Sequence, residues 1–392
     1  MTAPLFLLDP PSPGPLWAPF TGVRPIAELR AGIWKIRERW EGVLGRKAKA
    51  LLADHVEGFS EGDEPDVRRA APIGGPAIIA VSWFAPSGEP PTVSPSARRL
   101  ENEGKTVAWV VPAGARWEGP DDTTGESAPI DGLELHGTFD LLHALEVLLP
   151  PDCADFLREQ RDEVPGGCLV VGDPGEVVCL GAHVEPGVIF DVRNGAIVLE
   201  EDTEVRAGTR LEGPFYAGTG SRLMGGDFRG TVIGPHCRVR GEISGSLFLG
   251  FSNKAHEGFI GHSVIGHWAN LGAGTTTSNL KNTYGEVQLQ VGSERIRTGR
   301  QFLGSLIGDH AKTAIGSLLN TGTTISTGTH LFGPPPVPKY VPPFSWGNAG
   351  SERLTQEGFL KIAERVMPRR NVELTPERRA SLIATHRRLS GT

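Results

Sequence analysis

A six-residue periodicity in the second half of the chain restricts its fold more than any other feature. An aliphatic or small residue recurs at every sixth position in four blocks: Leu199, Val205, Leu211, Ala217 and Leu223; Ile233, Val239 and Gly245; Phe259, Ile265 and Leu271; Ile307, Thr313, Leu319, Ile325 and Leu331. Six residues fit one short strand and one turn on each side of a triangular prism, with three such units in each coil. Stacked coils share a continuous core. The repeat therefore predicts a left-handed parallel β-helix.

The repeat is interrupted twice, between about Gly245 and Gly258 and between Thr276 and Arg300. We expect loops to leave the prism at both places, and loops on a rigid scaffold often carry chemistry. The 52 glycines and 32 prolines, with only 7% aromatic residues, fit a coil of short strands and tight turns.

The first half has a different pattern, in which strand-like and helix-like segments alternate. Apolar runs at 5–8, 77–81 and 107–111 predict strands. One apolar face over 24–40 predicts a helix ended by Gly45, and 143–160 predicts a connecting helix interrupted at Pro150 and Pro151. We therefore expect an α/β domain over 1–150, a linker over 151–166, the β-helix over 167–332, and a Pro-rich segment with C-terminal helices over 333–392, at about 351–367 and 375–389.

Charge and cysteine usage narrow the class of protein. A net charge of -7 argues against nucleic acid as a partner, since phosphate backbones are bound by an excess of Lys and Arg. The four cysteines show neither CxxC spacing nor the density of a disulfide scaffold, so we expect thiols in a reducing cytoplasm. No run of about 18 apolar residues occurs, so we expect neither secretion nor a membrane span.

Two segments carry a resemblance to a known family. Asn253-Lys254-Ala255-His256 and the stretch from Phe259 to Asn279, which contains Asn270-Leu271-Gly272-Ala273-Gly274, closely resemble the acetyltransferase half of bacterial bifunctional UDP-N-acetylglucosamine diphosphorylase/glucosamine-1-phosphate N-acetyltransferases. The whole chain resembles a divergent branch of that family, whose first half is a sugar nucleotidyltransferase-like domain with a signature over 24–40. The resemblance implies acyl transfer from acetyl-coenzyme A to an amino-sugar phosphate.

The resemblance also implies roles for single residues. His256 falls on the catalytic base, and a His suits that work because its pKa lies near the operating pH. Asn270 and Asn279 fall on residues that orient the sugar and the acyl group, and Arg240 falls on a phosphate-binding arginine. Ala273 and Ser317 fall where the backbone meets acetyl-coenzyme A. Resembling enzymes form this site between subunits, so we expect a homotrimer.

The chain departs from the family in its acceptor site. Phe259 stands where the family has a tyrosine, and the segment between Arg240 and His256 is shorter by most of one coil. Lys254 and Lys281 are candidates to replace two family lysines in binding the substrate.

The first half departs further. Sugar nucleotidyltransferases carry a Gly-rich loop after the first strand, whose amides hold the triphosphate. Here that place reads Asp9-Pro10-Pro11-Ser12-Pro13-Gly14-Pro15, and prolines lack amide donors. Arg24 and Arg30 are candidates to bind a nucleotide instead, or they are helix-surface residues. We expect altered or impaired nucleotidyl transfer, with UTP and Mg²⁺ as its implied reactant and metal.

Two other classes of protein stay open. His262 and His267 resemble the paired ligands of gamma-class carbonic anhydrases, although they occupy different places within their repeats. The other open class is a non-catalytic hexapeptide scaffold, which is compatible with Phe259 in place of the family's tyrosine and with the altered first loop.

Overall fold

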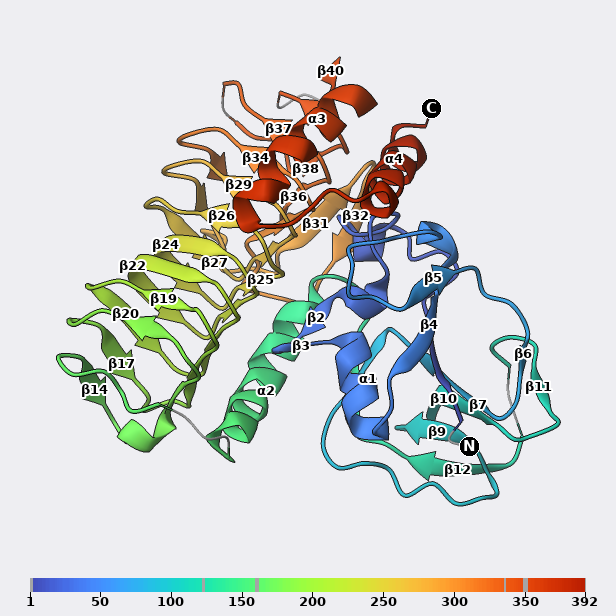
Figure 1. Cartoon of the computed structure of the whole chain (residues 1–392). Coiled ribbons are helices and arrows are strands. Elements are labelled where there is room, and N and C mark those ends of the chain that lie inside the picture. Colours follow the sequence, from blue (N-terminus) through green and yellow to red (C-terminus); the bar gives the residue numbers. More distant parts are fainter. Residues whose placement is uncertain (1–2, 122–123, 159–161, 335, 348–351, 392) are drawn as a thin grey trace.

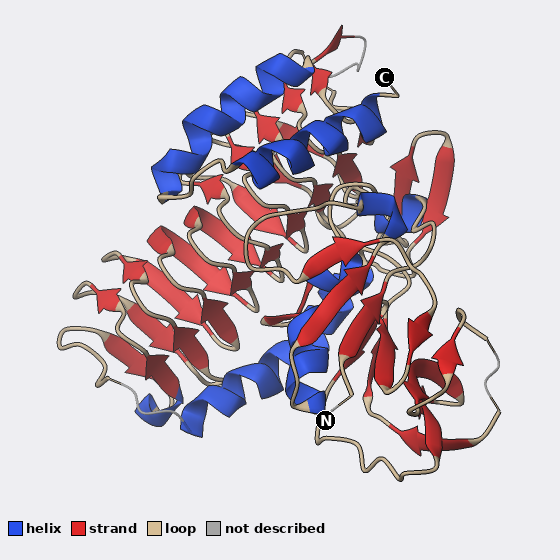
Figure 2. Cartoon of the chain, turned by 45° about the vertical axis from the view of Figure 1, so that its right-hand side comes forward, coloured by secondary structure: helices blue, strands red, loops and turns tan. Residues whose placement is uncertain are grey.

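The computed structural model describes residues 3–121, 124–158, 162–334, 336–347 and 352–391. An α/β domain is followed by a long parallel β-helix and two C-terminal helices (Figures 1 and 2). This confirms the predicted fold class. None of the described helices is long and apolar enough to cross a membrane.

The N-terminal domain is built on a seven-stranded mixed sheet in the order β12-β9-β10-β7-β1-β4-β5. β10 runs antiparallel to both of its neighbours, and the other pairs are parallel. The predicted strands at 5–8, 77–81 and 107–111 all lie in this sheet. Its strands are β1 (Leu5–Leu8), β4 (Ala48–Leu52), β5 (Asp66–Arg68), β7 (Ala77–Val81), β9 (Ala97–Asn102), β10 (Lys105–Val111) and β12 (Glu126–Pro129).

Shorter elements complete this domain. Three two-stranded pairs and three 3-10 turns connect the main strands: β2 (Arg30–Ala31) with β3 (Trp34–Lys35), β6 (Ile73–Gly74) with β11 (Arg116–Trp117), β8 (Phe84–Pro86) with β13 (Gly132–Glu134), and η1 (Pro15–Trp17), η2 (Ile26–Glu28) and η3 (Asp54–Val56). Helix α1 (Ile36–Leu44) packs beside the sheet, and α2 (Asp140–Asp155) runs along the β-helix (Figure 1).

The prediction of one helix over 24–40 is wrong in its extent. The segment forms η2, the β2–β3 pair and only then α1, although its apolar residues are buried as expected. Gly45 does end α1, in the left-handed conformation at φ 62°. The interruption of the next helix at Pro150 and Pro151 is also wrong, because α2 continues through both to Asp155 and then η4 (Phe156–Arg158).

The β-helix has three faces, which we call the first, second and third. The first face is a nine-stranded parallel sheet of β15 (Val177–Cys179), β18 (Ile197–Leu199), β21 (Phe215–Ala217), β23 (Val232–Ile233), β25 (Leu247–Phe248), β28 (Val264–Ile265), β33 (Ser305–Ile307), β36 (Thr323–Ile325) and β38 (Tyr340–Val341). The second face contains β16 (His183–Val184), β19 (Glu204–Val205), the first residues of β22 (Arg222–Arg229) and β24 (Arg238–Ser244), β26 (Asn253–Lys254), β29 (Asn270–Leu271), β34 (Lys312–Thr313), β37 (His330–Leu331), β39 (Ser345–Trp346) and the antiparallel β40 (Glu352–Arg353).

The third face contains β14 (Leu169–Val171), β17 (Ile189–Asp191), β20 (Thr209–Glu212), the last residues of β22 and β24, β27 (Phe259–Gly261), β30 (Thr276–Thr277) and β35 (Leu318–Leu319). The 3-10 turn η5 (Pro174–Glu176) joins β14 to β15. The hairpin of β31 (Gln288–Val291) and β32 (Glu294–Arg297) leaves the prism after this face. This confirms the second predicted interruption of the repeat.

The first predicted interruption is different, because no loop leaves the prism between Gly245 and Gly258. β25 and β26 continue the first and second faces there, and the periodicity fails only because the turns are one or two residues shorter. The register of the next block is also off by one. Ile260 lies in the interior and is fully buried, whereas Phe259 lies outside it and Gly245 is at a corner.

The β-helix extends beyond its predicted end at residue 332. β38 pairs with β36, and β39 pairs with β37, so the chain after the Pro-rich segment adds one more strand to the first face and one to the second. The predicted tail helices are confirmed as α3 (Gln356–Val366), followed by η6 (Met367–Arg370), and α4 (Pro376–Ser390). The Thr375 side chain accepts a hydrogen bond from the backbone amide of Arg378, as a helix N-cap does.

The outward side of the first face is buried against the N-terminal domain and α2. Its apolar side chains belong to the same core cluster as the domain's sheet: Val178, Val198, Tyr216, Val232, Leu247, Val264 and Leu306. This interface fixes the domain relative to the β-helix because it is continuous with the domain's own core.

Candidate active site

His256 lies at the corner between the second and third faces, which we call the His256 corner (residues 240, 256–258, 273–275 and 315–317). Consecutive coils stack here through backbone hydrogen bonds. The Gly274 amide donates to the Glu257 carbonyl at 2.9 Å, and the Gly316 amide donates to the Ala273 carbonyl at 2.8 Å. The His256 side chain is exposed. The corner therefore presents an imidazole to solvent from a rigid scaffold.

Arg240 lies one coil below His256. Its Nε donates to Glu257 Oε1 at 2.6 Å, and its Nη1 donates to the Met224 carbonyl at 3.1 Å. The side chains of Arg240 and Glu257 are 45% and 70% exposed, so a phosphate can displace the carboxylate without burying a charge.

Lys254 lies inside the prism, at a position where most other coils have an apolar residue. It is fully buried, and its Nζ donates to the Arg240 carbonyl at 3.2 Å and to the His256 carbonyl. Burial lowers the pKa of Lys254 to about 8. The expectation that Lys254 binds substrate is therefore not supported. Its amine instead joins the backbone of two predicted site residues.

The two predicted asparagines lie apart. Asn270 is on the second face, one coil above Asn253, whose Nδ2 donates to Asn270 Oδ1 at 2.9 Å. Asn279 lies beyond the third face, where its Nδ2 contacts His262 Nδ1 at 2.8 Å. Lys281 follows it, and its Nζ donates to the Glu286 carbonyl at the base of the hairpin.

Phe259 lies on the third face between the His256 corner and the residues Asn279, His262 and Lys281, which we call the Asn279 group. A Cβ atom added to Gly261 would lie 2.4 Å from Phe259 Cζ and 2.6 Å from Asn279 Nδ2. The ring of Phe259 therefore occupies space that only a glycine at 261 leaves open, next to Asn279. Since Phe259 is three residues from His256, it connects the His256 corner to the Asn279 group.

The predicted coenzyme A residues lie at and near the His256 corner. Ala273 is one coil above His256, and Ser317 is one coil higher, with its Oγ donating to the Ala314 carbonyl at 2.8 Å. Two large apolar side chains next to them are open to solvent: Ile315 is 82% exposed and Leu318 is 64% exposed. An apolar patch of this kind on a regular face favours a contact with another molecule.

The two histidines of the carbonic anhydrase alternative do not converge. His262 contacts Asn279 and stacks on Phe302, with ring centroids 5.2 Å apart. His267 lies at the domain interface, where its Nδ1 is 3.1 Å from Glu61 Oε2. Within the described residues, no three His, Cys, Asp or Glu side chains group as metal ligands.

The segment after β1, where the resembling enzymes bind a triphosphate, is anchored at both ends in this chain, at Asp9 and at Gly22. Asp9 Oδ2 accepts a hydrogen bond from the Ile26 amide at 2.7 Å and contacts His55 Nε2 at 3.0 Å. Arg388 of α4 donates to the Gly22 carbonyl at 2.7 Å, so the C-terminal helix packs on the loop. The Asp9 carboxylate is therefore engaged by protein partners, and within the described part of the chain no cluster of three His, Cys, Asp or Glu side chains surrounds it, so this segment offers no preformed Mg²⁺ site.

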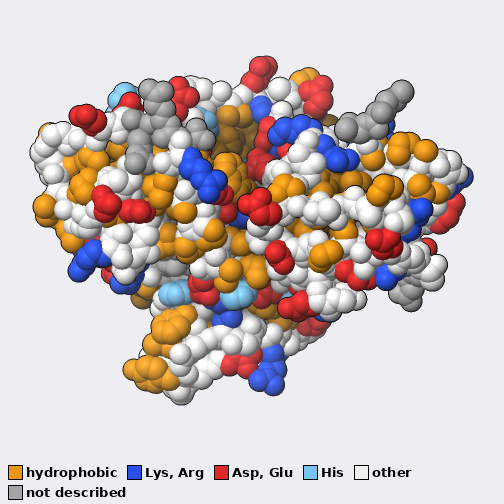
Figure 3. Space-filling model, turned by 90° about the horizontal axis from the view of Figure 1, so that it is seen from below, with side chains coloured by type: hydrophobic (Ala, Val, Ile, Leu, Met, Phe, Trp, Pro, Cys, Tyr) orange, Lys and Arg blue, Asp and Glu red, His pale blue; other side chains and the backbone are white. Residues whose placement is uncertain are grey.

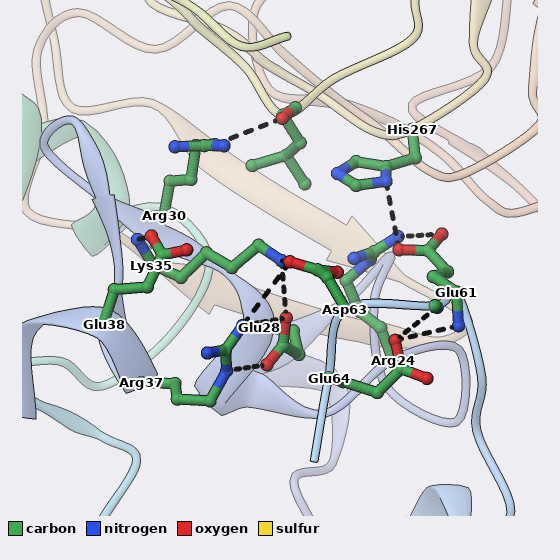
Figure 4. A network of polar contacts seen from close by, with 12 residues as sticks. Arg24, Glu28, Arg30, Lys35, Arg37, Glu38, Glu61, Asp63, Glu64 and His267 are labelled. Carbon is green, nitrogen blue, oxygen red and sulfur yellow. Dashed lines mark hydrogen bonds and ion pairs between the residues drawn. The ribbon is translucent and has the colours of Figure 1, made fainter. Parts of the chain in front are cut away.

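Arg24 and Arg30 face the β-helix and not an open cleft (Figure 4). Arg24 is fully buried and pairs with Asp309 at 2.6 Å and with Glu61 at 2.8 Å. Arg30 donates to the Leu249 carbonyl at 3.2 Å and to the Ile33 carbonyl. The expectation that these two arginines bind a nucleotide is therefore not supported, because each has protein partners at the domain interface.

The network around Arg24 was not foreseen from the sequence. Glu61 lies between Arg24 and His267, and Asp309 Oδ1 also accepts from the His267 amide at 2.9 Å. A second group in the N-terminal domain consists of Glu28, Lys35, Arg37 and Asp63. The high density of charge between Arg24 and Glu41 is the signal that could have indicated both groups, since buried charges require partners.

A groove of about 850 Å³ lies between α1, α2 and residues 86–90. Its lining contains Glu38, Arg39 and Asp152 but none of the predicted site residues. His256 is instead exposed at the corner between the second and third faces. The candidate active site is therefore the His256 corner and not this larger groove.

Fold and site together define a class: a nucleotidyltransferase-like domain joined to a hexapeptide β-helix with an exposed histidine at one corner. Comparison with known proteins agrees with this class. Residues 15–81 match the family model of sugar nucleotidyl transferases.

The chain is also similar to bifunctional relatives. It is 32% identical over 184 residues to the bifunctional sugar-1-phosphate nucleotidylyltransferase/acetyltransferase of Sulfurisphaera tokodaii, covering 43% of this chain and 46% of the relative. It is 26% identical over 215 residues to the bifunctional protein GlmU of Methanococcus aeolicus, covering 49% and 52%. The resemblance predicted from the sequence is confirmed. These matches span about half the length of either relative.

Proposed function

We propose that this chain is a transferase that moves an acetyl group from acetyl-coenzyme A to the amine of a sugar phosphate such as glucosamine 1-phosphate. The observation that carries the proposal is the His256 corner, where an exposed imidazole stands between Arg240 one coil below and Ala273 one coil above. The acetyltransferase named in the S. tokodaii relative supports the same chemistry. The expected cytoplasmic location suits these reactants.

In the proposed reaction His256 acts as general base. The amine nitrogen attacks the thioester carbonyl carbon while the imidazole takes a proton from it. The carbon–sulfur bond then breaks, the amide forms, and the coenzyme A thiolate recovers a proton from the imidazolium. Arg240 binds the sugar phosphate, and Asn270 orients the acceptor.

We further propose that the complete site needs a second copy of the chain, in a homotrimer. Asn279 and Lys281 lie across the third face from His256. The exposed Ile315 and Leu318, on one coil at the edge of this face, give a neighbouring copy an apolar surface to cover. A neighbour can then bring its own Asn279 group to the His256 corner.

Nucleotidyl transfer from UTP is a second candidate, because residues 15–81 match a sugar nucleotidyl transferase family. The Pro-rich loop after β1 offers few amides, and α4 packs on the chain further along, at Gly22. We propose that this activity is weak or altered. Pyrophosphate release from UTP and glucosamine 1-phosphate at rates like those of acyl transfer would contradict that reading.

Replacement of His256 tests the main proposal. His256→Ala should lower kcat about 10²- to 10⁴-fold with little change in coenzyme A binding, measured by release of free thiol from acetyl-coenzyme A with glucosamine 1-phosphate. His267→Ala, at the domain interface, is the matched control and should have a much smaller effect. His262→Ala should also cost less than His256→Ala, because its ring contacts Asn279 and not the corner itself. Absence of acyl transfer in the wild-type protein would favour the scaffold alternative, and equal losses in all three variants with release of zinc would favour the carbonic anhydrase one.

A further inference from the structure

The C-terminal segment brings two arginines to the second face of the β-helix. α3 crosses successive coils of the β-helix, and its continuation η6 ends close to β24 and β26 (Figure 1). Arg370 Nε donates to the His236 carbonyl at 3.0 Å, and Met367 is buried in a cluster with Trp268. Asn371 ends η6 in the left-handed conformation at φ 57°. Arg369 and Arg370 are therefore held on the surface by a fixed turn.

Two more arginines come from the β-helix itself. Arg222 and Arg238 are paired in register on adjacent coils. The four side chains are close enough to influence one another. Partial burial, and after it the charges of Arg238, Arg369 and Arg222, lower the pKa of Arg370 to about 10. Burial, Arg222 and Arg369 likewise lower the pKa of Arg238.

Acidic partners are scarce around these four arginines. Glu204 pairs with Arg222 at 3.0 Å. Within the described ranges of the chain, Arg238, Arg369 and Arg370 have no ion-pair partner. Elsewhere on the molecule, as on the face seen in Figure 3, acidic and basic side chains alternate. The local surplus of positive charge raises the energy of the protein, and a bound polyanion would lower it.

We propose that Arg222, Arg238, Arg369 and Arg370 form a binding site for a phosphate polyanion. Guanidinium groups bind phosphate oxygens in a bidentate manner, and four of them suit a diphosphate or two separate phosphate groups. We call this set the arginine cluster.

The location of the arginine cluster connects it to the proposed acyl transfer. Arg238 pairs in register with Asn253, and Asn253 pairs with Asn270, so the cluster continues the same row of the second face. Arg240, two residues after Arg238, belongs to the His256 corner. The assignment of the polyanion to a substrate of this corner rests on the proposed function, whereas the anion site itself does not.

Two substrates contain this chemistry: coenzyme A, in its adenosine 3′,5′-bisphosphate part, and the sugar side, as a sugar phosphate or a nucleoside diphosphate. Binding of three probes to the full chain, measured by isothermal titration calorimetry, separates these sources. The probes are adenosine 3′,5′-bisphosphate, glucosamine 1-phosphate and UDP.

Arg369→Gln/Arg370→Gln should weaken at least one probe about 10-fold or more, and added salt should reduce the difference. Arg365→Gln/Arg387→Gln is the matched control, because it removes the same charge from exposed positions of α3 and α4. Weakening of the adenosine probe assigns the cluster to coenzyme A, and weakening of either other probe assigns it to the sugar side.

Arg370 also holds η6 in place, so Arg369→Gln alone serves as a second variant that leaves the His236 contact intact. Unchanged binding of all three probes in both cluster variants would overturn the proposal. Loss of probe binding in a protein that has no acyl transfer activity would instead keep the anion site and overturn the proposed function.

Discussion

Asp309→Asn should loosen the contact between the N-terminal domain and the β-helix. Asp309 Oδ2 accepts from Arg24 Nη2 at 2.6 Å and from Arg24 Nε at 2.9 Å. The substitution removes the charge but keeps the shape and the oxygen that accepts from the His267 amide. Arg24 is fully buried, so water cannot solvate its guanidinium group once the Asp309 charge is removed.

The size of the effect follows from this burial. Burial alone lowers the pKa of Arg24, but Asp309 and Glu61 together outweigh it and raise that pKa above its usual value. Removing one partner of a buried ion pair costs about 3–5 kcal/mol, because the remaining charge is left without compensation. Since Glu61 still pairs with Arg24, we expect the lower end, about 3 kcal/mol.

Amide hydrogen exchange measures this loss locally. An interface destabilised by about 3 kcal/mol should open roughly 100-fold more often, so exchange should accelerate in peptides around Arg24 and around Asp309. Glu57→Gln is the control, because the Arg69–Glu57 pair is 73% and 52% exposed and should contribute less than about 1 kcal/mol. Equal protection in the two variants would refute the argument that this buried pair joins the domains.

Four further outcomes are expected. Lys254→Met should lower kcat of acyl transfer about 10-fold while changing Tm little, because the buried amine joins the backbones of Arg240 and His256. A kcat equal to that of the wild type would contradict this. Gly261→Ala should also lower kcat, since its methyl displaces Phe259 or Asn279. Gly166→Ala is the control, because an added Cβ there meets no atom within 4 Å. Ile315→Asp/Leu318→Asp should yield monomers by light scattering, whereas a monomeric wild type would disprove the trimer. Burial raises the pKa of Glu61, but Arg24 and His267 outweigh it and hold that pKa well below its usual range. The stabilising effect of the Glu61 carboxylate is therefore complete above about pH 4.5 and is lost as the pH falls. The Tm of Glu61→Gln should be lower than that of the wild type at neutral pH and should vary less than the wild-type Tm in acid.

The β-helix was predictable because its interior positions recur with a fixed spacing. The errors have local causes. Phe259 and Ile260 are adjacent apolar residues, and spacing alone does not say which one points inward. Lys254 occupies an interior position, where no sequence rule expects an ammonium. Short turns between Ile243 and Phe248 shift the repeat without forming a loop.

The segment 24–40 shows a different reason for failure. Its apolar residues are buried at the spacing of a helix, yet Gly32 at φ 69° turns the chain between β2 and β3. A Cβ at Gly32 would lie 2.3 Å from Asp152 Oδ2, so the turn depends on a contact with α2 that is distant in sequence. The arginine and carboxylate partners across the interface are distant in the same way, as Arg24 and Asp309 show.

Some signals of the interface were nevertheless present in the sequence. Strands such as Ile197-Val198-Leu199 are apolar at every position, although only alternate residues point into a β-helix. A continuous apolar run predicts burial on both sides of a sheet. Val198 is indeed buried against the N-terminal domain, while Ile197 and Leu199 face the interior.

The coverage of the three faces limits how copies of the chain can meet. The first face is covered by the N-terminal domain and α2, and the edge between the first and second faces is covered by α3. The third face, in contrast, presents Ile315 and Leu318 at its edge and Phe259 in its middle. In the proposed trimer, a neighbouring copy therefore approaches along the third face, because there the His256 corner and the Asn279 group both remain accessible.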